Sequence, residues 1–133
     1  MAKKWEKKAD KMWQKVIKQV GHCERCLATD KQLHAHHIIG RTAVAYRHDP
    51  SNGVCLCASC HTMSGWSAHH DRTGFLEWFA RNRTGQYEWF LEHTLEKKKL
   101  IGNEIHLVFH AKPREHISDE AEYDGLKEML ETL

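Results

Sequence analysis

Two Cys-x-x-Cys pairs enclose the part of the chain where reactive side chains are most dense. Cys23 and Cys26 form the first pair and Cys57 and Cys60 the second, with thirty residues between the pairs. A Cys-x-x-Cys turn presents two thiolates to one ion, and two such turns complete the tetrahedral shell of a structural zinc. A redox dithiol needs one such pair in a βαβ setting, which this chain lacks. The spacing therefore predicts a structural zinc site of four cysteines.

Each Cys-x-x-Cys pair forms what is called a zinc knuckle. The remaining cysteine, Cys55, has the wrong spacing to belong to either knuckle, and we expect it to be a small buried strand residue. Ligand sets that pair the first two cysteines with His34 or His36 would leave the second knuckle without a partner, so they rank low. The N-terminus lacks the apolar core of a signal peptide. We therefore expect a reducing cytosol, where metal binding by cysteine is favoured over disulfides.

Two adjacent histidines, His36 and His37, lie between the cysteine pairs, and His61 follows the last cysteine directly. Adjacent residues of a strand point to opposite faces of a sheet, so His36 and His37 are expected to play different roles. An imidazole can act as a metal ligand or as a base near neutral pH. These residues indicate a hydrolytic centre that is separate from the zinc site.

Together with the knuckles, the order of these residues resembles the HNH endonuclease family, specifically its four-cysteine, zinc-knuckle branch common in bacteriophages. The segments that carry the resemblance are His36-His37, Asn52-Gly53-Val54 and Cys60-His61. The resemblance covers roughly residues 21–80 and continues through the phage-like segments 67–71 and 75–79. It implies an α+β fold: a ββα-metal (HNH) nuclease core with a structural zinc site of four cysteines, flanked by α-helices.

The resemblance also implies roles for individual residues. His37 would be the general base that deprotonates water, and Asn52 would fix the loop and orient that base through hydrogen bonds. A catalytic divalent metal (Mg²⁺, Mn²⁺, Ni²⁺ or Zn²⁺) would act as Lewis acid on the phosphate and on the leaving oxygen.

Two ligands of that metal would be His36 and His61. A third protein ligand is expected at His69 in preference to His70. The chain departs here from the shorter His-x-x-x-His pattern of colicin-type members, because Gly65 stands at that position.

Basic residues suggest how a polyanion would be held. Arg41 and Arg47 are expected on the loop beside the site, where they could clamp phosphates without reading bases. Residues 1–20 carry seven lysines against two acidic residues, whereas residues 101–133 carry three basic and eight acidic residues. A basic front with an acidic tail permits a polyanion partner on one face.

The periodicity of apolar residues predicts a single domain over residues 1–133. A basic amphipathic helix over 1–20, which Gly21 ends, precedes the zinc-bound core at 21–80 and a helical C-terminal extension at 81–133. Within these parts we expect strands at 33–39, 54–56 and 104–110, and helices from about 57 to 63 and at 73–83, 84–99 and 119–133, the last capped by Ser118 or Asp119.

The resulting functional hypothesis is a metal-dependent DNA endonuclease that leaves 5′-phosphate and 3′-hydroxyl ends. One site per chain favours nicking by a monomer or weak dimer. A phage or prophage origin implies the cytoplasm of a bacterial host, and no apolar run is long enough to span a membrane. The alternatives are a non-catalytic zinc module that binds DNA, an accessory nuclease of a packaging or recombination machine that is inactive without its partner, and an RNA nuclease.

Overall fold

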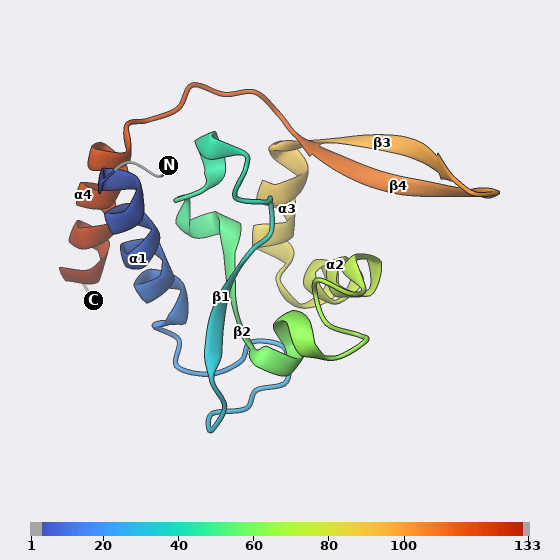
Figure 1. Cartoon of the computed structure of the whole chain (residues 1–133), viewed down its shortest axis with the longest axis horizontal. Helices are drawn as coiled ribbons and strands as arrows, with labels where there is room; N and C mark the ends of the chain where they lie inside the picture. Colours follow the sequence, from blue (N-terminus) through green and yellow to red (C-terminus); the bar gives the residue numbers. More distant parts are fainter. Residues whose placement is uncertain (1–3, 132–133) are drawn as a thin grey trace.

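A computed structural model describes residues 4–131 of the chain. At its centre lies a two-stranded antiparallel sheet of β1 (Leu33–His37) and β2 (Gly53–Cys57). Figure 1 shows helices α1 and α4 on one side of this hairpin and α2 and α3 on the other. The fold is therefore the α+β arrangement expected from the sequence, with helices that flank a small β core.

Helix α1 (Lys4–Lys18) presents lysines to solvent and buries Ala9 and Trp13 against the sheet. The predicted helix began at residue 1, and residues 1–3 lie outside the described part of the chain. Gly21 ends the helix as expected, because its φ of +80° is disfavoured for residues with a Cβ and its amide donates to the carbonyl of Lys18 (3.1 Å).

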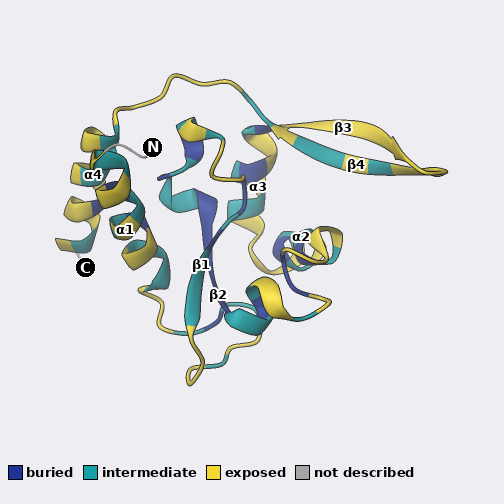
Figure 2. Ribbon diagram, viewed as in Figure 1, coloured by how far each residue is buried: buried dark blue, intermediate teal, exposed yellow. Residues whose placement is uncertain are grey.

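The pairing of the two strands places His37 opposite Gly53 and His36 opposite Val54. Every residue of β2 is buried (Figure 2). A Cβ at Gly53 would lie 2.8 Å from the Trp13 ring and closer still to Ile17. Glycine at this position therefore lets α1 lie directly against the start of β2.

Short helical turns follow each strand. The 3₁₀ turns η1 (Val44–Tyr46) and η2 (Pro50–Asn52) fill the connection between β1 and β2. A single π-helical turn, η3 (Ser59–Met63), follows β2 where a helix was expected. Of the candidate site residues, Asn52 lies on η2 and His61 on η3.

Helices α2 (Arg72–Asn82) and α3 (Thr84–Glu92) cover the other side of the hairpin and supply much of the core. The Asp71 side chain caps α2 by accepting from the amide of Gly74 (3.0 Å). The fully buried rings of this core are Tyr46, Phe75, Phe79 and Phe90.

A long hairpin of β3 (Thr94–Ile101) and β4 (Glu104–Ala111) follows α3 and projects from the body (Figure 1). The strand expected at 104–110 is confirmed. The helix expected at 84–99 is wrong beyond Glu92, so the extension at 81–133 is only partly helical. The lysine run at 97–99 has good helix propensity, but pairing across the two-residue turn Gly102-Asn103, with Gly102 at a φ of +62°, overrides it.

Helix α4 (Asp119–Glu131) confirms the acidic closing helix as far as the description reaches; residues 132–133 lie outside it. Ser118 caps it by accepting from the amide of Ala121 (3.3 Å). The helix packs beside α1, with the Tyr123 and Trp5 rings 5.6 Å apart. None of the helices in the described chain combines the length and the apolar character that crossing a bilayer requires.

Candidate active site and zinc site

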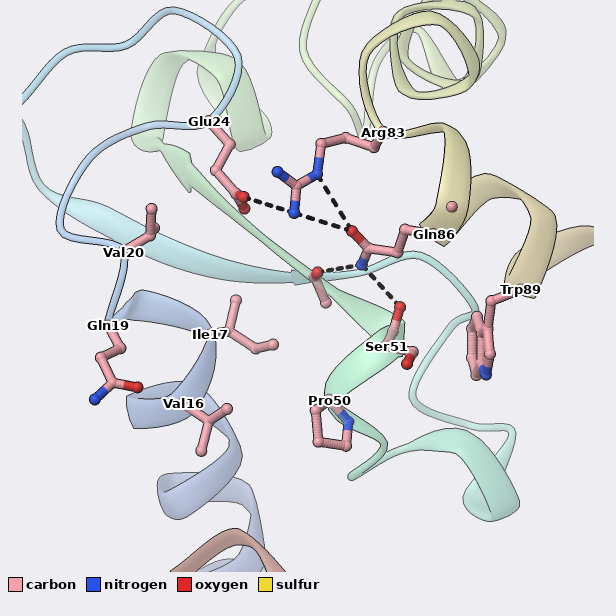
Figure 3. Close-up of a pocket in the computed structure, with 12 residues that line it drawn as sticks. Val16, Ile17, Gln19, Val20, Glu24, Pro50, Ser51, Arg83, Gln86 and Trp89 are labelled. Atoms are coloured by element: carbon pink, nitrogen blue, oxygen red, sulfur yellow. Dashed lines mark hydrogen bonds and ion pairs between the residues drawn. The ribbon is translucent and has the colours of Figure 1, made fainter. Parts of the chain in front are cut away.

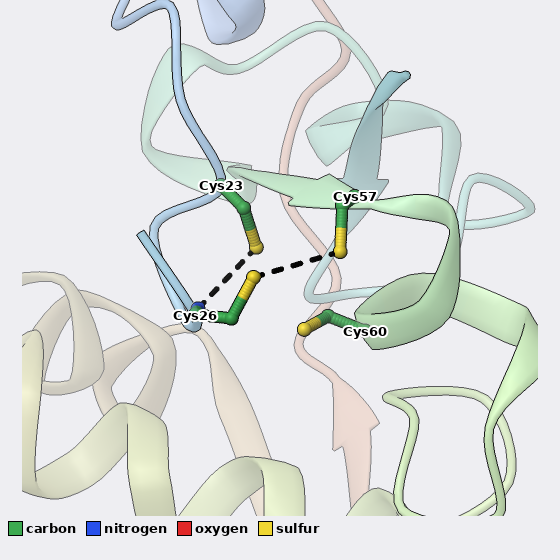
Figure 4. Close-up of side chains that lie close together, drawn as sticks. All are labelled: Cys23, Cys26, Cys57 and Cys60. Carbon is green, nitrogen blue, oxygen red and sulfur yellow. Dashed lines mark hydrogen bonds between the residues drawn. The ribbon is translucent and has the colours of Figure 1, made fainter. Parts of the chain in front are cut away.

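The four cysteines of the two knuckles converge on one point (Figure 4). Cys23 and Cys26 come from the loop after α1, Cys57 ends β2, and Cys60 lies on η3. Their sulfurs all lie within 4.8 Å of one another, and the Cys26 and Cys57 sulfurs are 3.7 Å apart. Four sulfurs at about 2.3 Å from a tetrahedral zinc would be about 3.8 Å from each other. The donor set and its spacing fit a structural zinc.

The backbone shapes the first knuckle for this purpose. Leu27 adopts a left-handed φ of 67°, its amide donates to the carbonyl of Cys23 (2.8 Å), and the Cys23 amide donates to Ala28 (2.9 Å). Burial opposes ionisation of the Cys23 thiol, but backbone amides around the sulfur outweigh it and lower its pKa to about 7. The backbone therefore favours the thiolate that zinc requires at Cys23, whereas burial and the neighbouring thiols raise the pKa of Cys26.

The spare cysteine behaves as expected. Cys55 is fully buried in β2, and burial raises the pKa of its thiol to about 11. All five cysteines lie within the described residues, and none forms a disulfide.

A second cluster gathers three histidines from different segments. His36 lies on β1, His61 on η3, and His69 in the loop before α2, and one ring nitrogen from each lies within 4.8 Å of the others. The Nε2 atoms of His61 and His69 are 3.0 Å apart. His36 Nε2 is buried and has no hydrogen-bond partner among the described residues. Such an orphaned buried nitrogen, directed at two further imidazoles, fits a divalent metal ligand.

The cluster favours neutral imidazoles with free lone pairs. Burial, with the neighbouring rings of His61 and His69, lowers the pKa of His36 to about 2. Burial and the proximity of His69 lower the pKa of His61 to about 4. His70, the other candidate for the third ligand, lies outside the cluster. The structure thus brings together the three histidines expected at the metal.

His34 was not among the residues expected at the site, but its Nδ1 lies 3.0 Å from His61 Nδ1. A signal for this contact was present, because His34 and His36 are two residues apart on one strand and share a face. His34 therefore helps to set the ring orientation of His61.

His37 lies on the opposite side of β1, under helix α1. Its ring stacks on Trp13 with centroids 3.9 Å apart, and its Nε2 lies 2.9 Å from the carbonyl oxygen of Arg47. A carbonyl only accepts, so Nε2 carries the proton and Nδ1 keeps its lone pair when the ring is neutral. Burial lowers the pKa of His37, so the ring is neutral at pH 7. This is the protonation state of a general base.

Asn52 is fully buried and bonded to the loop that carries Arg47. Its Oδ1 accepts from the Ile39 amide (2.6 Å), and its Nδ2 donates to the carbonyls of Ile39 (2.9 Å) and Tyr46 (3.0 Å). No hydrogen bond joins Asn52 to His37 among the described residues. Asn52 fixes the loop, but the bond that orients His37 comes from the backbone of Arg47.

Arg47, expected from the sequence to clamp phosphate, is paired with carboxylates. Its guanidinium forms a bidentate pair with Asp10 of α1 (2.8 and 2.7 Å) and lies 3.3 Å from Glu6. A phosphate would have to displace two carboxylates that already neutralise it. These pairs tie the loop behind His37 to α1, and the phosphate clamp at Arg47 stays a prediction.

The proposed base and the metal-site histidines open into one pocket of about 500 Å³. The pocket is lined by His36, His37, His61 and His69, and also by Trp13, Gln14, Arg41 and Arg72. Arg41 is exposed, and no ion pair among the described residues engages it. Arg72, which the sequence did not single out, is the first residue of α2 and donates to the carbonyl of Ile38 (3.0 Å). Two cations therefore face the space between the base and the metal ligands.

A larger hollow of about 800 Å³ lies between the end of α1 and α3 (Figure 3) and contains none of these histidines. Its polar side chains satisfy one another: Arg83 pairs with Glu24 (3.1 Å), and Gln86 donates to the carbonyls of Ser51 (2.8 Å) and Gly53 (2.6 Å). This arrangement brackets the turn before β2, and we assign no chemistry to it.

Comparison with known proteins bears on the same segment. Residues 23–66, about a third of the chain, match the family model of the HNH endonuclease. Searches of the curated proteins and of the solved structures found no match. The matched range holds all four zinc-site cysteines and His36, His37, Asn52 and His61, but it leaves out His69, Arg72 and the β3–β4 hairpin. Over residues 23–66 the chain is therefore similar to the HNH endonuclease, a family of metal-dependent phosphodiester hydrolases.

Proposed function

We propose that the protein cuts DNA with His37 as general base and with a divalent metal held by His36, His61 and His69. The observation that carries this proposal is that a candidate base and a candidate set of metal ligands line one pocket. His37, a neutral imidazole with a free Nδ1, lines the same pocket as the three imidazoles that converge at the proposed metal site.

The chain's own residues account for proton transfer. Nδ1 of His37 takes a proton from the attacking water while Nε2–H stays bonded to the Arg47 carbonyl. The resulting imidazolium is stacked on Trp13 and lies in the field of Asp10, whose charge favours the protonated ring. Asn52 acts as a positioning residue, because its three hydrogen bonds hold the loop that supplies that carbonyl.

The substrate phosphate would meet Arg41 and Arg72 at the pocket. When bound, the divalent ion supplies Lewis-acid polarisation of the phosphate and stabilises charge on the leaving oxygen. The new P–O bond forms to the water oxygen and the bond to the 3′ oxygen breaks, which leaves a 5′-phosphate and a 3′-hydroxyl. The described residues contain one such histidine centre, so a monomer would cut one strand in each encounter and produce nicks.

The proposal is tested by relaxation of supercoiled plasmid in Mg²⁺, Mn²⁺ or Ni²⁺, with an EDTA control. The wild type should yield open circles, and His37→Ala should lower the rate roughly 10²- to 10⁴-fold. His70→Ala is the matched control, because His70 is an exposed histidine outside the cluster. Its rate should stay near that of the wild type.

Other outcomes point elsewhere. A folded, zinc-loaded wild type that binds plasmid but cuts it in none of the metals would replace the nuclease with a zinc DNA-binding module, or with an accessory protein inactive without its partner. Linear product in the first turnover would overturn nicking by a monomer. Faster cutting of RNA than of DNA in a competition assay would overturn the choice of substrate.

A further inference from the structure

Three hollows meet at Arg72 and connect the active-site pocket with the β3–β4 hairpin. The first is the histidine pocket itself. The second, of about 200 Å³, is lined by Arg72 together with Thr42 and His110. The third, of about 240 Å³, lies between the start of α2 and the hairpin, where Arg72 meets His106 and Val108. A surface path thus leads from the catalytic histidines to the projecting hairpin.

The hairpin is poorly explained as a packing element. Beyond Thr94 every residue of β3 is exposed, and Leu100 and Ile105 near its tip are 69% and 71% exposed (Figure 2). A two-stranded ribbon is at best marginally stable alone in water. Its base is anchored by Phe109 against Phe90, with ring centroids 5.0 Å apart. Its length and exposure are those of an arm that contacts a partner.

The register of the hairpin separates its lysines by face. Lys97 pairs with Val108 and Lys99 with His106, so these four residues share one face. The third hollow lies along β4 and is lined by Val108 and His106 of this face and by Leu107 of the other. Lys98 pairs with Leu107 and lies on the opposite face. The face of Val108 and His106 is therefore the one that carries two lysines and an imidazole.

Of the two carboxylates of the hairpin strands, Glu104 shares the face of Lys99 and His106 and offsets part of this charge, whereas Glu96 does not. Glu96 pairs with Phe109 and so lies on the opposite face, with Lys98. Glu104 at the tip lies 3.2 Å from His106. Arg41 and Arg72 line the pocket of the proposed nuclease, and Lys97 and Lys99 lie opposite Val108 and His106, two residues of the third hollow.

We infer that the β3–β4 hairpin is a DNA-binding arm that holds the duplex backbone next to the scissile phosphate. The inference rests on the proposed function and deepens it. Strands of eight residues, at about 3.3 Å per residue, reach roughly 26 Å, or about eight base pairs of duplex. A two-stranded ribbon also has the width that a DNA groove admits. Lysine contacts to phosphate make this arm sequence-independent.

The test is DNA affinity, measured by fluorescence anisotropy on a labelled duplex of about 30 base pairs in the His37→Ala background, where cutting does not interfere. Lys97→Glu and Lys99→Glu should each weaken binding roughly three- to ten-fold at moderate salt and reduce the slope of log K against log salt by about 1. Lys98→Glu, the same charge change on the opposite face, should weaken binding less than about two-fold. Circular dichroism spectra must be unchanged in all three variants.

Equal affinity losses for Lys97→Glu and Lys98→Glu, or no loss for either, would overturn the proposal that the β3–β4 hairpin binds DNA. A dimer that Ile105→Lys dissociates in sedimentation equilibrium, with DNA binding unchanged, would overturn it in favour of an interface between copies of this chain. The nuclease is judged separately by plasmid cutting. Nicking by the wild type with hairpin variants that bind normally rejects the arm alone, whereas hairpin-dependent binding without any cutting rejects the nuclease alone.

Discussion

The cysteine cluster and the histidine cluster are built from overlapping segments, yet they differ in what they leave open. Four sulfurs face one another, and three of the four cysteines are buried. The three imidazoles instead line a pocket of about 500 Å³, and His69 is exposed. A structural zinc has a closed protein shell, whereas a catalytic metal needs positions left for water and substrate. The closed cysteine cluster therefore fits a role in stability, and the open histidine cluster fits a role in catalysis.

The two clusters share one turn of helix. Cys60 and His61 are consecutive residues of η3, a five-residue π-helical turn between β2 and the loop that carries His69. The amide of Ala68 donates to the Cys60 carbonyl (2.8 Å) and that of His69 to the His61 carbonyl (3.1 Å). Fixing the cysteine site therefore helps to fix the histidine site.

The largest effect is expected from Cys57→Ser, which removes one thiolate from the closed shell. Zinc binding by such sites contributes folding free energy on the order of 10 kcal/mol, so the variant should lose zinc, helical signal and activity together. Zinc content by mass spectrometry and thermal melting by circular dichroism measure this. Cys55→Ala is the matched control, because Cys55 is a buried cysteine of the same strand outside the cluster. A normal melting temperature for Cys57→Ser would refute the structural zinc.

A more selective effect is expected from His61→Ala, which opens the other cluster. The protein should stay folded and keep its zinc but lose cleavage and its stabilisation by a second divalent ion. For the wild type, Mn²⁺ at about 100 times its dissociation constant should add about 2.7 kcal/mol to the free energy of unfolding. Thermal melts across a Mn²⁺ titration measure the difference, with His70→Ala expected to respond like the wild type. Loss of zinc from His61→Ala would mean that the two clusters are not separable.

What the sequence predicted well was local. The knuckles and the metal-site histidines are spaced by turns and a short hairpin, so residue type and order place them. Trp13 was visible only as part of an apolar stripe, because nothing in α1 indicates that its ring will stack on His37. The same limit applies to Arg47, whose partner Asp10 lies 37 residues away in the chain.

The hairpin shows the other limit of sequence reasoning. Leu95 continued the helical spacing of α3, and the lysines that follow are helix formers, so local propensity favoured a helix. The two-residue turn Gly102-Asn103 was the available signal for a hairpin. His48 carries no local signal for burial, yet it is 2% exposed, because its partners Asp10 and Glu122 come from both ends of the chain.

These partners form a third polar cluster, which sharpens the contrast between the first two. His48, Asp119 and Glu122 place ligand atoms within 4.8 Å of one another. Here the donors are already paired: His48 Nδ1 lies 2.8 Å from Glu122, and His48 Nε2 lies 2.7 Å from Asp10. The cluster ties α4 to α1 as an ion pair and leaves no imidazole lone pair for a metal.

The smallest effect is therefore expected from His48→Gln, and it should depend on pH. Burial lowers the pKa of His48, but hydrogen bonds to Glu122 and Asp10 outweigh it, so the folded pKa is raised above 6.5. A raised pKa contributes stability below the unfolded value and loses it as pH rises through the folded value. His48→Gln should thus cost about 1–2 kcal/mol at about pH 6 and less at about pH 9, in urea unfolding with His70→Gln as the exposed control. A cost independent of pH would show that His48 acts by packing, and stabilisation by added Mn²⁺ that this variant abolishes would make the cluster a metal site after all.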